Sequence, residues 1–366
     1  MKTVTIVQNS MKTTVIFRLS LIRRLISDGY RVNILALNDC DNSLIELKKI
    51  GCDVYPIDGF KSVSEFIKYL ASLNYKYLQL AKSTDVFLVF FIISYLLILP
   101  GSMVKKARMI VSIEGLGTIF MRSRILCKLL KFLLSRKNIT RLFCNKDENR
   151  LLGREGDTIT NGIGIELSKF RGVKVLNESK TTKLLYVGRL IKDKGVLDAV
   201  ECLRQLLDIG VNASLDLVGD IYPDNPSSLT NQQISHFREE FGDNIKFHGF
   251  VSDTVPYYLS SDILLLPSLR EGFPVCVMEA NACGVPAIVY DVPGSQDAIV
   301  SYVNGQVVPY GDIGLIKKAV VEIKSNYEEY SRKSRGYALV NFDCESKNSL
   351  FLNAIKYKLQ FDEARF

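Results

Sequence analysis

The chain has 366 residues, of which 47% are hydrophobic and 23% are charged, and its formal net charge is +8. One hydrophobic core rarely serves more than roughly 250–300 residues, so this length predicts a folded globular protein with two domains. The chain has two histidines, His236 and His248, which argues against a histidine metal site and a Ser-His-Asp triad. Its eight cysteines lack Cys-x-x-Cys spacing, which argues against a zinc site and a disulfide framework.

Apolar strand patterns alternate with helical patterns along the whole chain, which indicates a parallel α/β architecture. Residues 1–8 already alternate as a strand and lack the pattern of a signal peptide, so we expect a cytoplasmic protein. Strands of the first half are predicted at Thr3–Gln8, Val32–Leu37, Val86–Phe91, Met109–Ile113 and Arg141–Cys144. The helices predicted between them include Phe17–Asp28, Ser64–Leu73 and Ser123–Leu134.

The same alternation resumes after a polar stretch at Phe170–Thr182. Strands are predicted at Lys183–Val187, Ala213–Val218, Ile245–Phe247, Ile263–Leu266 and Ala287–Tyr290. The helices include Gly195–Ile209, Asn231–Phe241, Pro256–Leu259 and Val277–Cys283. We therefore predict an N-terminal domain over residues 1–170 and a C-terminal domain over 182–345, with residues 346–366 forming a helix that packs back toward the N-terminal domain.

Two segments of the first half raise the question of membrane contact. The run Val86–Leu99 has about 14 mostly apolar residues, fewer than the roughly 20 of a spanning helix, which favours a buried strand followed by a core helix. Residues 120–138 place apolar side chains at helical spacing among six cations and no acid, a pattern typical of an amphipathic helix on an anionic membrane. Residues 1–177 also carry 28 Lys and Arg against 14 Asp and Glu, whereas the remainder carries 19 against 25. The alternative interpretation of residues 120–138 is an ordinary domain helix with a solvated basic face.

The segment YVGRLIKDKG, from Tyr186 to Gly195, lies where a strand ends and a helix begins. Gly188 allows a ligand to approach the backbone, Arg189 offers a forked donor that suits phosphate oxygens, and Lys194 adds a point charge. Together these residues can hold a diphosphate and stabilise the charge that it gains as a leaving group. The pattern Gly-Arg-x4-Lys by itself is weakly specific.

Glu271 and Glu279 lie eight positions apart, on either side of a Gly-x-Pro turn that follows the apolar run Ile263–Leu266. The pattern predicts a strand, a turn and a helix start, where unpaired backbone N–H groups suit phosphate or hydroxyl-rich ligands. Carboxylates bind phosphate poorly but accept hydrogen bonds from sugar and ribose hydroxyls. We interpret the segment as half of a nucleotide-sugar site. The alternative is that Glu271 is a solvated loop residue and Glu279 an ordinary acid near a helix N-terminus.

Taken in order, these segments resemble the family 4 glycosyltransferases of the GT-B fold. The resemblance extends over almost the full length and rests on NGIGIELSKF, YVGRLIKDKG, HGFVSD and SSDILLLPSLREGFPVCVMEANACGVPAIV. It implies an α/β fold in which two Rossmann-like, doubly wound domains face a central cleft. Through Phe17-Arg18-x3-Ile22 and Val111-Ser-Ile-Glu-Gly-Leu-Gly117, the first half is similar to bacterial enzymes that add N-acetylgalactosamine (GalNAc) to a polyprenyl-diphosphate-linked sugar.

The resemblance assigns donor-side roles to matched residues. Arg189 and Lys194 would bind the donor diphosphate, and Glu271 would hold the donor sugar beside them as the third catalytic residue. Glu279 would accept hydrogen bonds from the ribose hydroxyls. Further donor contacts are implied for Gly188, Phe250, Val251, Gly272, Phe273, Pro274 and Val275. Of these, Phe250 and Val251 would lie beside the base, and Pro274, which lacks an N–H, would only shape the turn.

Acceptor-side roles follow in the same way. Arg18 is a candidate for the acceptor diphosphate, and Glu114, Gly115 and Gly117 would face the acceptor beyond the end of a central strand. Relatives often carry a histidine just before the Phe-Arg pair, where this chain has Ile16, and another near Phe90–Ile93. These departures leave the acceptor contacts and the identity of the sugar open.

We therefore expect a retaining glycosyltransferase that needs no metal or other cofactor. It would move a hexose or N-acetylhexosamine, with GalNAc as the best guess, from a UDP-sugar to a polyprenyl-diphosphate-linked saccharide in O-antigen, capsule or glycoprotein glycan assembly. The expected location is the anionic inner face of the bacterial cytoplasmic membrane, with no nucleic acid as partner. A GT-B sugar-nucleotide hydrolase or epimerase and a non-catalytic scaffold of a polysaccharide assembly complex are alternatives. A nucleic-acid-binding module is suggested only by the basic first half.

Overall fold

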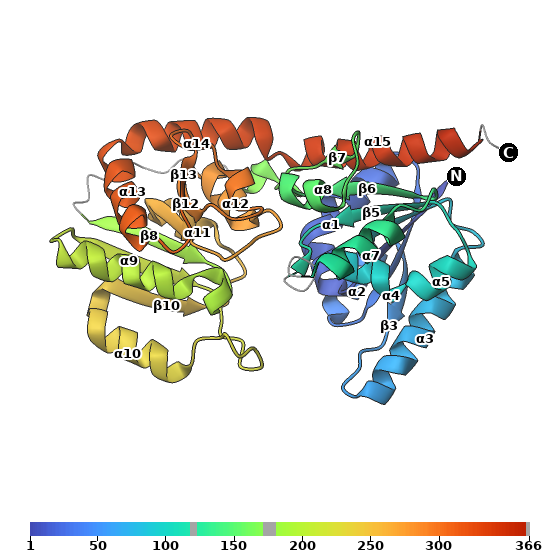
Figure 1. Ribbon diagram of the computed structural model, residues 1–366, viewed down its shortest axis with the longest axis horizontal. Helices are drawn as coiled ribbons and strands as arrows, with labels where there is room; N and C mark the ends of the chain where they lie inside the picture. Colours follow the sequence, from blue (N-terminus) through green and yellow to red (C-terminus); the bar gives the residue numbers. More distant parts are fainter. Residues whose placement is uncertain (118–122, 171–180, 364–366) are drawn as a thin grey trace. The chain divides into compact units, whose positions relative to one another are not determined.

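The computed structural model describes residues 1–117, 123–170 and 181–363 and divides into two compact units (Figure 1). Unit 1 contains Met1–Ile163 and the C-terminal residues from Cys344, and unit 2 contains Gly164–Asp343. The division falls at residue 163/164 rather than at the predicted residue 170. Residues 164–170 belong to unit 2 because the Ile165 N–H donates to the Phe342 carbonyl (2.8 Å) and Arg335 donates to the Phe170 carbonyl (3.1 Å).

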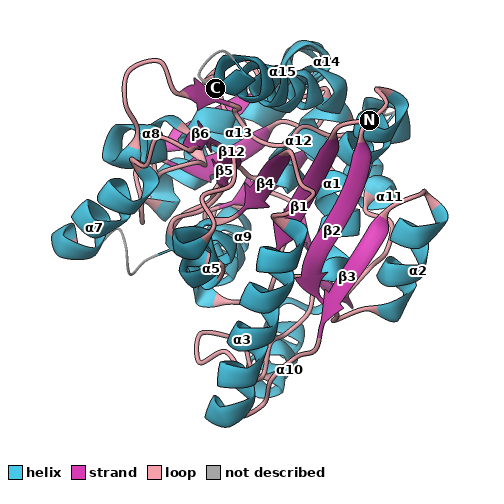
Figure 2. Cartoon of the chain, turned by 90° about the vertical axis from the view of Figure 1, so that its right-hand side faces the viewer, coloured by secondary structure: helices cyan, strands magenta, loops and turns pink. Residues whose placement is uncertain are grey.

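Unit 1 is built on a parallel seven-stranded sheet in the order β3-β2-β1-β4-β5-β6-β7. Its strands are β1 (Thr3–Gln8), β2 (Arg31–Leu37), β3 (Asp53–Ile57), β4 (Val86–Phe90), β5 (Met109–Ile113), β6 (Ile139–Phe143) and β7 (Thr158–Ile159). Figure 2 shows β3, β2 and β1 running side by side. The chain order reverses between β1 and β4, and ligands of such sheets bind beyond the carboxyl ends of the strands at this switch point.

Helices cover both faces of this sheet. One face carries α3 (Val63–Leu80), α4 (Ile92–Leu97), α5 (Leu99–Val104), α7 (Arg124–Leu134) and α8 (Lys146–Leu152); the other carries α1 (Met11–Ser27), α2 (Asp41–Lys49) and α15 (Cys344–Glu363). Helix α1 begins six residues before the predicted start because the Ser10 side chain caps it by accepting from the Thr13 N–H (3.0 Å). Helix α15 packs on α1 and on β4, where Phe351 lies against Phe90 with ring centroids 5.5 Å apart.

The central strands of unit 1 read as continuous apolar runs because both of their faces are buried. Phe87 and Val89 of β4 join the hydrophobic cluster on one face, and Val86, Leu88 and Phe90 join the cluster on the other. The run that begins at Val86 is thus a core strand followed by α4, as predicted. Within the described ranges, every helix is too short or too polar to span a bilayer.

Unit 2 has a parallel six-stranded sheet in the order β10-β9-β8-β11-β12-β13. Its strands are β8 (Thr182–Val187), β9 (Ala213–Val218), β10 (Ile245–Gly249), β11 (Ile263–Leu266), β12 (Ala287–Tyr290) and β13 (Gly305–Val308). Its α-helices are α9 (Val196–Asp208), α10 (Asn231–Phe241), α11 (Val255–Ser260), α12 (Val275–Ala282), α13 (Ile313–Ser325) and α14 (Tyr327–Asn341). The switch point of this sheet lies between β8 and β11.

Candidate active site

A buried ion pair lies at the switch point of unit 2, beyond the carboxyl ends of β8 and β11. The Lys194 ammonium contacts both carboxylate oxygens of Glu271, at 2.7 and 2.6 Å. Ser268 donates its hydroxyl to Glu271 Oε1 at 2.8 Å. The two charged side chains are 23% and 12% exposed, so water screens their interaction only partly. Two of the three residues predicted to be catalytic are therefore in direct contact, although 77 positions separate them.

The turn before α9 brings Lys194 to this position. Lys194 ends a 3₁₀ turn (Lys192–Lys194), and Gly195 follows with φ of 76°, a conformation that favours glycine. A Cβ at Gly195 would lie 1.9 Å from the Pro267 carbonyl oxygen, so only glycine lets the turn pass so close to the end of β11. The Leu269 N–H also donates to the Asp193 carbonyl (2.9 Å), which joins the turn to the segment that carries Glu271.

Arg189, the third predicted catalytic residue, follows β8 and is held differently. Its side chain is exposed, and its guanidinium lies 5.5 Å from the Tyr222 ring. It makes no ion pair with any residue that the structure describes. Its backbone is fixed, because the Tyr186 hydroxyl donates to the Arg189 carbonyl at 2.7 Å. The site therefore presents one solvent-exposed cation next to one that is already paired.

The ligand approach predicted at Gly188 stays a prediction, and the close backbone contact beside it depends on Gly219. A Cβ on Gly188 would meet only the Tyr186 side chain, at 3.4 Å or more. A Cβ on Gly219, which has φ of 144°, would lie 1.8 Å from the Gly188 carbonyl oxygen. The close approach is thus between the ends of β8 and β9. Sequence reasoning missed Gly219 because the glycine required for this contact follows a different strand.

Glu279 lies on α12 and is bound by two side chains from the segment of α11. The Tyr258 hydroxyl donates to Glu279 Oε2 at 2.8 Å, and the Thr254 hydroxyl does so at 3.5 Å. Burial raises the pKa of Glu279, and these hydrogen bonds oppose the shift. Burial also raises the pKa of Tyr258 well above its usual value, which keeps this hydroxyl a donor. Tyr258 was not predicted as a site residue, and its position in an apolar helix carried no signal of the role.

The remaining predicted donor residues lie at the same edge of the sheet. The Glu271 N–H donates to the Pro293 carbonyl (3.1 Å), and the Phe273 ring packs edge-on against Phe342, so that this side chain points into the core. Pro274 is the N-cap residue of α12, which begins at Val275, two residues before the predicted start. Gly272 lies within the same turn, and Phe250 and Val251 directly follow β10.

In unit 1, the predicted acceptor residues Arg18 and Glu114 form an ion pair at the switch point between β1 and β4. Arg18 comes from α1 and Glu114 follows β5. Ser112 donates its hydroxyl to Glu114 Oε1 at 2.8 Å. The Arg18 guanidinium carbon lies 3.8 Å from the centroid of the Phe90 ring, and the side chain is only 2% exposed. The pair is thus almost completely removed from water.

The turn after Glu114 is held by a residue that sequence reasoning missed. Glu148 Oε1 accepts hydrogen bonds from the backbone N–H groups of Gly115 and Leu116, each at 2.8 Å. Gly115 and Gly117 have φ of 105° and 71°, which only glycine adopts readily. Burial raises the pKa of Glu148 to about 7, against the effect of these hydrogen bonds. The sequence carried no signal for Glu148, which reads as an ordinary acid in the first turn of α8.

Comparison with known proteins identifies the second half of the chain. Residues 170–338 match the family model described as Glycosyl transferases group 1. Residues 170–338 are a group 1 glycosyl transferase domain. The match covers most of unit 2, including the Lys194–Glu271 pair, Arg189 and Glu279.

Two curated relatives extend this comparison. The chain is 30% identical over 216 residues to the N,N'-diacetylbacillosaminyl-diphospho-undecaprenol alpha-1,3-N-acetylgalactosaminyltransferase of Campylobacter jejuni, which covers 53% of the chain and 55% of that enzyme. It is 29% identical over 167 residues to the capsular polysaccharide biosynthesis glycosyltransferase CapM of Staphylococcus aureus, covering 44% and 43%. The chain thus spans about half the length of these relatives.

Solved structures resemble the whole chain. Sucrose-phosphate synthase from Thermosynechococcus elongatus superposes with a TM-score of 0.78 at 17% identity, over 98% of this chain and 99% of that one. Anabaena HepE, in complex with UDP and glucose, gives 0.76 at 16% identity, over 98% and 100%. These neighbours and the two parallel sheets confirm the predicted GT-B fold class, with two Rossmann-like units.

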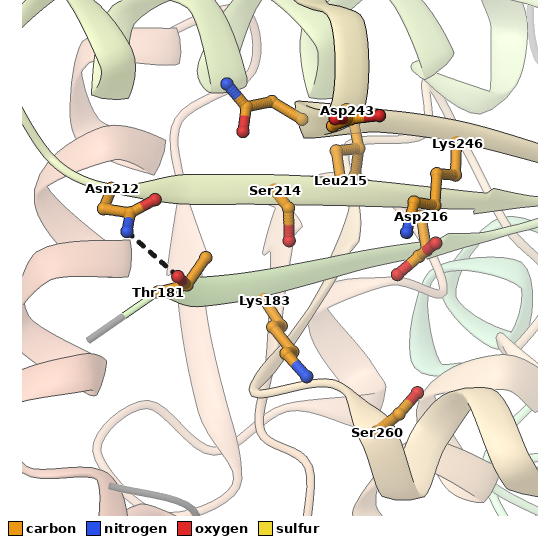
Figure 3. Close-up of a pocket in the computed structure, with 10 residues that line it drawn as sticks. Thr181, Lys183, Asn212, Ser214, Leu215, Asp216, Asp243, Lys246 and Ser260 are labelled. Atoms are coloured by element: carbon orange, nitrogen blue, oxygen red, sulfur yellow. Dashed lines mark hydrogen bonds between the residues drawn. The ribbon is translucent and has the colours of Figure 1, made fainter. Parts of the chain in front are cut away.

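The group 1 domain also carries a hollow away from these residues (Figure 3). This cavity of about 270 Å³ lies toward the amino ends of β8, β9 and β10, where Asn212 donates to the Thr181 hydroxyl at 3.0 Å. Nearby, His248 contacts Asp216 at 2.6 Å. None of the predicted site residues lines the cavity. The other histidine, His236, is an exposed residue of α10.

Outside the group 1 domain, the amphipathic helix predicted within residues 120–138 is α7 (Arg124–Leu134), and residues 120–122 of the predicted segment lie outside the described residues. The structure divides its apolar side chains between two faces. Leu130 and Leu134 are buried in the core, whereas Ile125, Leu129 and Phe132 are 79%, 52% and 72% exposed. The exposed residues lie among the exposed cations Arg124, Lys128 and Lys131. The predicted stripe also contained Leu126 and Leu133, which are half-buried, so Ile125, Leu129 and Phe132 form its exposed part.

Proposed function

We propose that the protein is a retaining glycosyltransferase that moves a hexose or N-acetylhexosamine, with GalNAc as the best candidate, from a UDP-sugar to a lipid-linked saccharide. The observation that carries the proposal is the Lys194–Glu271–Ser268 cluster beside the exposed Arg189, at the switch point of a group 1 domain. The related fold of HepE was solved with UDP and with UDP-glucose, which supports a uridine diphosphate donor. The name of the Campylobacter relative supports GalNAc and an undecaprenol-linked acceptor.

The proposed chemistry uses charge rather than a metal or another cofactor. The bond between the anomeric carbon and the donor phosphate oxygen breaks, and UDP leaves with the electron pair. Arg189 and Lys194 stabilise the negative charge that develops on the diphosphate. The acceptor hydroxyl forms its bond to the anomeric carbon from the same face, and its proton passes to the departing phosphate. Glu271 holds the hydroxyls of the transferred sugar, and Glu279 those of the ribose.

The acceptor is assigned to unit 1. Glu114 and the turn at Gly115–Gly117 lie beyond the carboxyl end of β5, where parallel sheets bind ligands. A polyprenyl-diphosphate-linked saccharide fits the names of relatives that assemble bacterial glycans, including capsular polysaccharide and teichuronic acid. The product would be an O-antigen, capsule or glycoprotein glycan, built at the inner face of the cytoplasmic membrane.

The surface of α7 supports this location. Ile125, Leu129 and Phe132 can enter the headgroup region while Arg124, Lys128 and Lys131 contact anionic lipids. We expect the protein to sediment with vesicles that contain phosphatidylglycerol, and less so at high salt. Ile125→Ser with Phe132→Ser should abolish this binding, whereas Val63→Ser, which removes an equally exposed apolar residue from α3, should not. Equal binding of both variants would contradict the assignment.

A donor and acceptor screen tests the function. Purified protein is mixed with UDP-GalNAc, UDP-GlcNAc, UDP-galactose or UDP-glucose, with and without a polyprenyl-diphosphate saccharide. We expect acceptor-dependent UDP release and a product whose new linkage keeps the anomeric configuration of the donor. UDP release that is independent of the acceptor would instead indicate a sugar-nucleotide hydrolase, and the absence of any turnover would favour a scaffold.

A further inference from the structure

Two buried side chains hold the turn after β5 from opposite sides. On one side, Glu148 accepts from the N–H groups of Gly115 and Leu116 through a single oxygen, at 2.8 Å each. On the other side, the carboxylate of Glu114 is bound by Arg18 and by the Ser112 hydroxyl. Three consecutive residues are therefore fixed by contacts from α1, β5 and α8.

Arg18 is almost inaccessible to a ligand, because its side chain is buried and its guanidinium already contacts three residues. Its Nη2 binds Glu114, its Nε lies 3.4 Å from Gln8 Oε1, and its guanidinium covers the Phe90 ring. The side chain is 2% exposed, and the Phe90 ring is supported by Phe351 of α15. To reach a diphosphate, Arg18 would have to leave the Glu114 carboxylate buried without its charge partner, which is strongly unfavourable.

The strained backbone of this region shows why such support is needed. Gly115 has φ of 105°, and Phe91, which directly follows β4, has φ of 65°, a conformation that bulky residues rarely adopt. Strained conformations persist only where the surroundings determine them, and they gather at functional sites. The strained residue is Phe91, whereas the N–H groups bound by Glu148 belong to a turn whose positive φ values at Gly115 and Gly117 suit glycine.

We propose that Glu148 and Arg18 are positioning residues that hold the turn Glu114–Gly117 for the acceptor, and that this turn recognises hydroxyl groups of the acceptor saccharide rather than its diphosphate. The inference rests on the proposed function, because it assigns the turn to the acceptor. The Glu114 charge is balanced by Arg18, so the carboxylate can accept from a neutral hydroxyl and has no cation to offer to a phosphate.

The first experiment compares Glu148→Ala, Glu148→Gln and the control Glu155→Ala, which removes an exposed acid from the loop after α8. Hydrogen exchange of the peptide containing Gly115 and Leu116 is measured by mass spectrometry, together with the KM values for both substrates. Glu148→Ala should speed exchange and raise the acceptor KM, each roughly tenfold, and should leave the UDP-sugar KM within about twofold. Glu148→Gln should resemble the wild type, because its amide oxygen can accept both hydrogen bonds. Unchanged exchange, equal changes in both KM values, or a Gln variant that behaves like Ala would overturn the proposal.

A second variant tests the turn without removing Glu148, in case Glu148→Ala does not fold. A Cβ on Gly115 meets no atom within 4 Å, so Gly115→Ala causes no clash and acts through the strain of alanine at φ of 105°. Urea unfolding of the variant checks that it is folded in the assay. It should raise the acceptor KM and spare the UDP-sugar KM, and an unchanged acceptor KM would overturn the assignment. If the wild-type protein transfers sugar to no acceptor, the proposed function is refuted. The exchange rates of the Glu148 variants then still test the positioning role, because they do not depend on activity.

Arg18→Gln separates positioning from diphosphate binding. If Arg18 supports the turn, the variant raises the KM of a polyprenyl-diphosphate saccharide and of the same saccharide without diphosphate by the same factor. A loss confined to the diphosphate-bearing acceptor would show that Arg18 binds the diphosphate directly and would overturn this part of the proposal.

Discussion

Arg189 and Lys194 carry the two positive charges of the proposed donor site, and the structure predicts that their removal has different consequences. The Arg189 side chain is exposed. Within the described residues its guanidinium makes a cation–π contact with the Tyr222 ring and no ion pair. Lys194 is bound to both oxygens of Glu271. We therefore expect Arg189→Ala to impair turnover without changing stability, and Lys194→Ala to impair both.

The magnitudes follow from these contacts. A donor that stabilises developing charge contributes about 2–4 kcal/mol, so Arg189→Ala should lower kcat/KM by roughly 30- to 1000-fold. An exposed cation–π contact contributes about 0.5–1 kcal/mol, which limits the loss in the free energy of unfolding. Lys194→Ala leaves the Glu271 carboxylate, 12% exposed, with Ser268 but without its cation, which costs about 1–3 kcal/mol of stability in addition to the catalytic loss.

The assay is acceptor-dependent UDP release at varied donor concentration, combined with urea unfolding of each variant. Lys192→Ala is the matched control, because Lys192 is an exposed cation of the same 3₁₀ turn. It should leave kcat/KM within about threefold of the wild type, as expected for a surface charge outside the site. The reasoning is refuted if Arg189→Ala retains near-normal kcat/KM, or if Lys192→Ala loses as much activity as Arg189→Ala.

Three further predictions follow. Tyr258→Phe removes a hydrogen bond that lowers the pKa of Glu279, so this pKa should rise further. In steady-state kinetics the KM for the UDP-sugar should increase about threefold to tenfold. An unchanged KM would show that Glu279 does not bind the ribose. Because no metal takes part in the proposed reaction, treatment with EDTA should leave the initial rate unchanged, and a loss restored by Mg²⁺ or Mn²⁺ would contradict this. Burial, with a smaller contribution from the Glu114 charge, raises the pKa of Glu148 to about 7, so the folded state binds more protons than the unfolded state between about pH 4.5 and 7. Stability should therefore fall by up to about 3 kcal/mol as pH rises through this window in urea unfolding, and Glu148→Gln should flatten this part of the profile.

The sequence was sufficient to locate the strands that are buried on both faces. β1, β5, β9, β11 and β12 have the predicted bounds. β5, β11 and β12 are almost continuous apolar runs, as expected of parallel strands covered by helices, whereas β9 alternates with the half-buried Ser214 and Asp216. The edge strands β3, β7 and β13 were not predicted. They are short, and β3 contains Asp53 and Pro56, so their formation depends on pairing with a neighbour rather than on their own pattern.

The charged and glycine-rich motifs of the proposed donor site were also visible in the sequence. YVGRLIKDKG and the segment from Glu271 to Glu279 each join a strand end to a helix start, and the rules of parallel sheets place such ends at one edge. The sequence could not show which charges would pair. Lys194 is neutralised by Glu271 while Arg189 remains exposed, because the turn at Gly195 passes against the end of β11 and brings only one of the two cations to the carboxylate.

The supporting residues were decided by the tertiary structure alone. Tyr258 reaches Glu279 from α11, and Glu148 reaches the turn after β5 from a helix 33 positions away. Each looks ordinary in its own segment, because a hydrogen bond between distant residues depends on how two elements pack and not on the local pattern of either. Local periodicity therefore determined the layers and the edge at which ligands bind, whereas the packing of helices onto those layers determined which side chains hold the site in place.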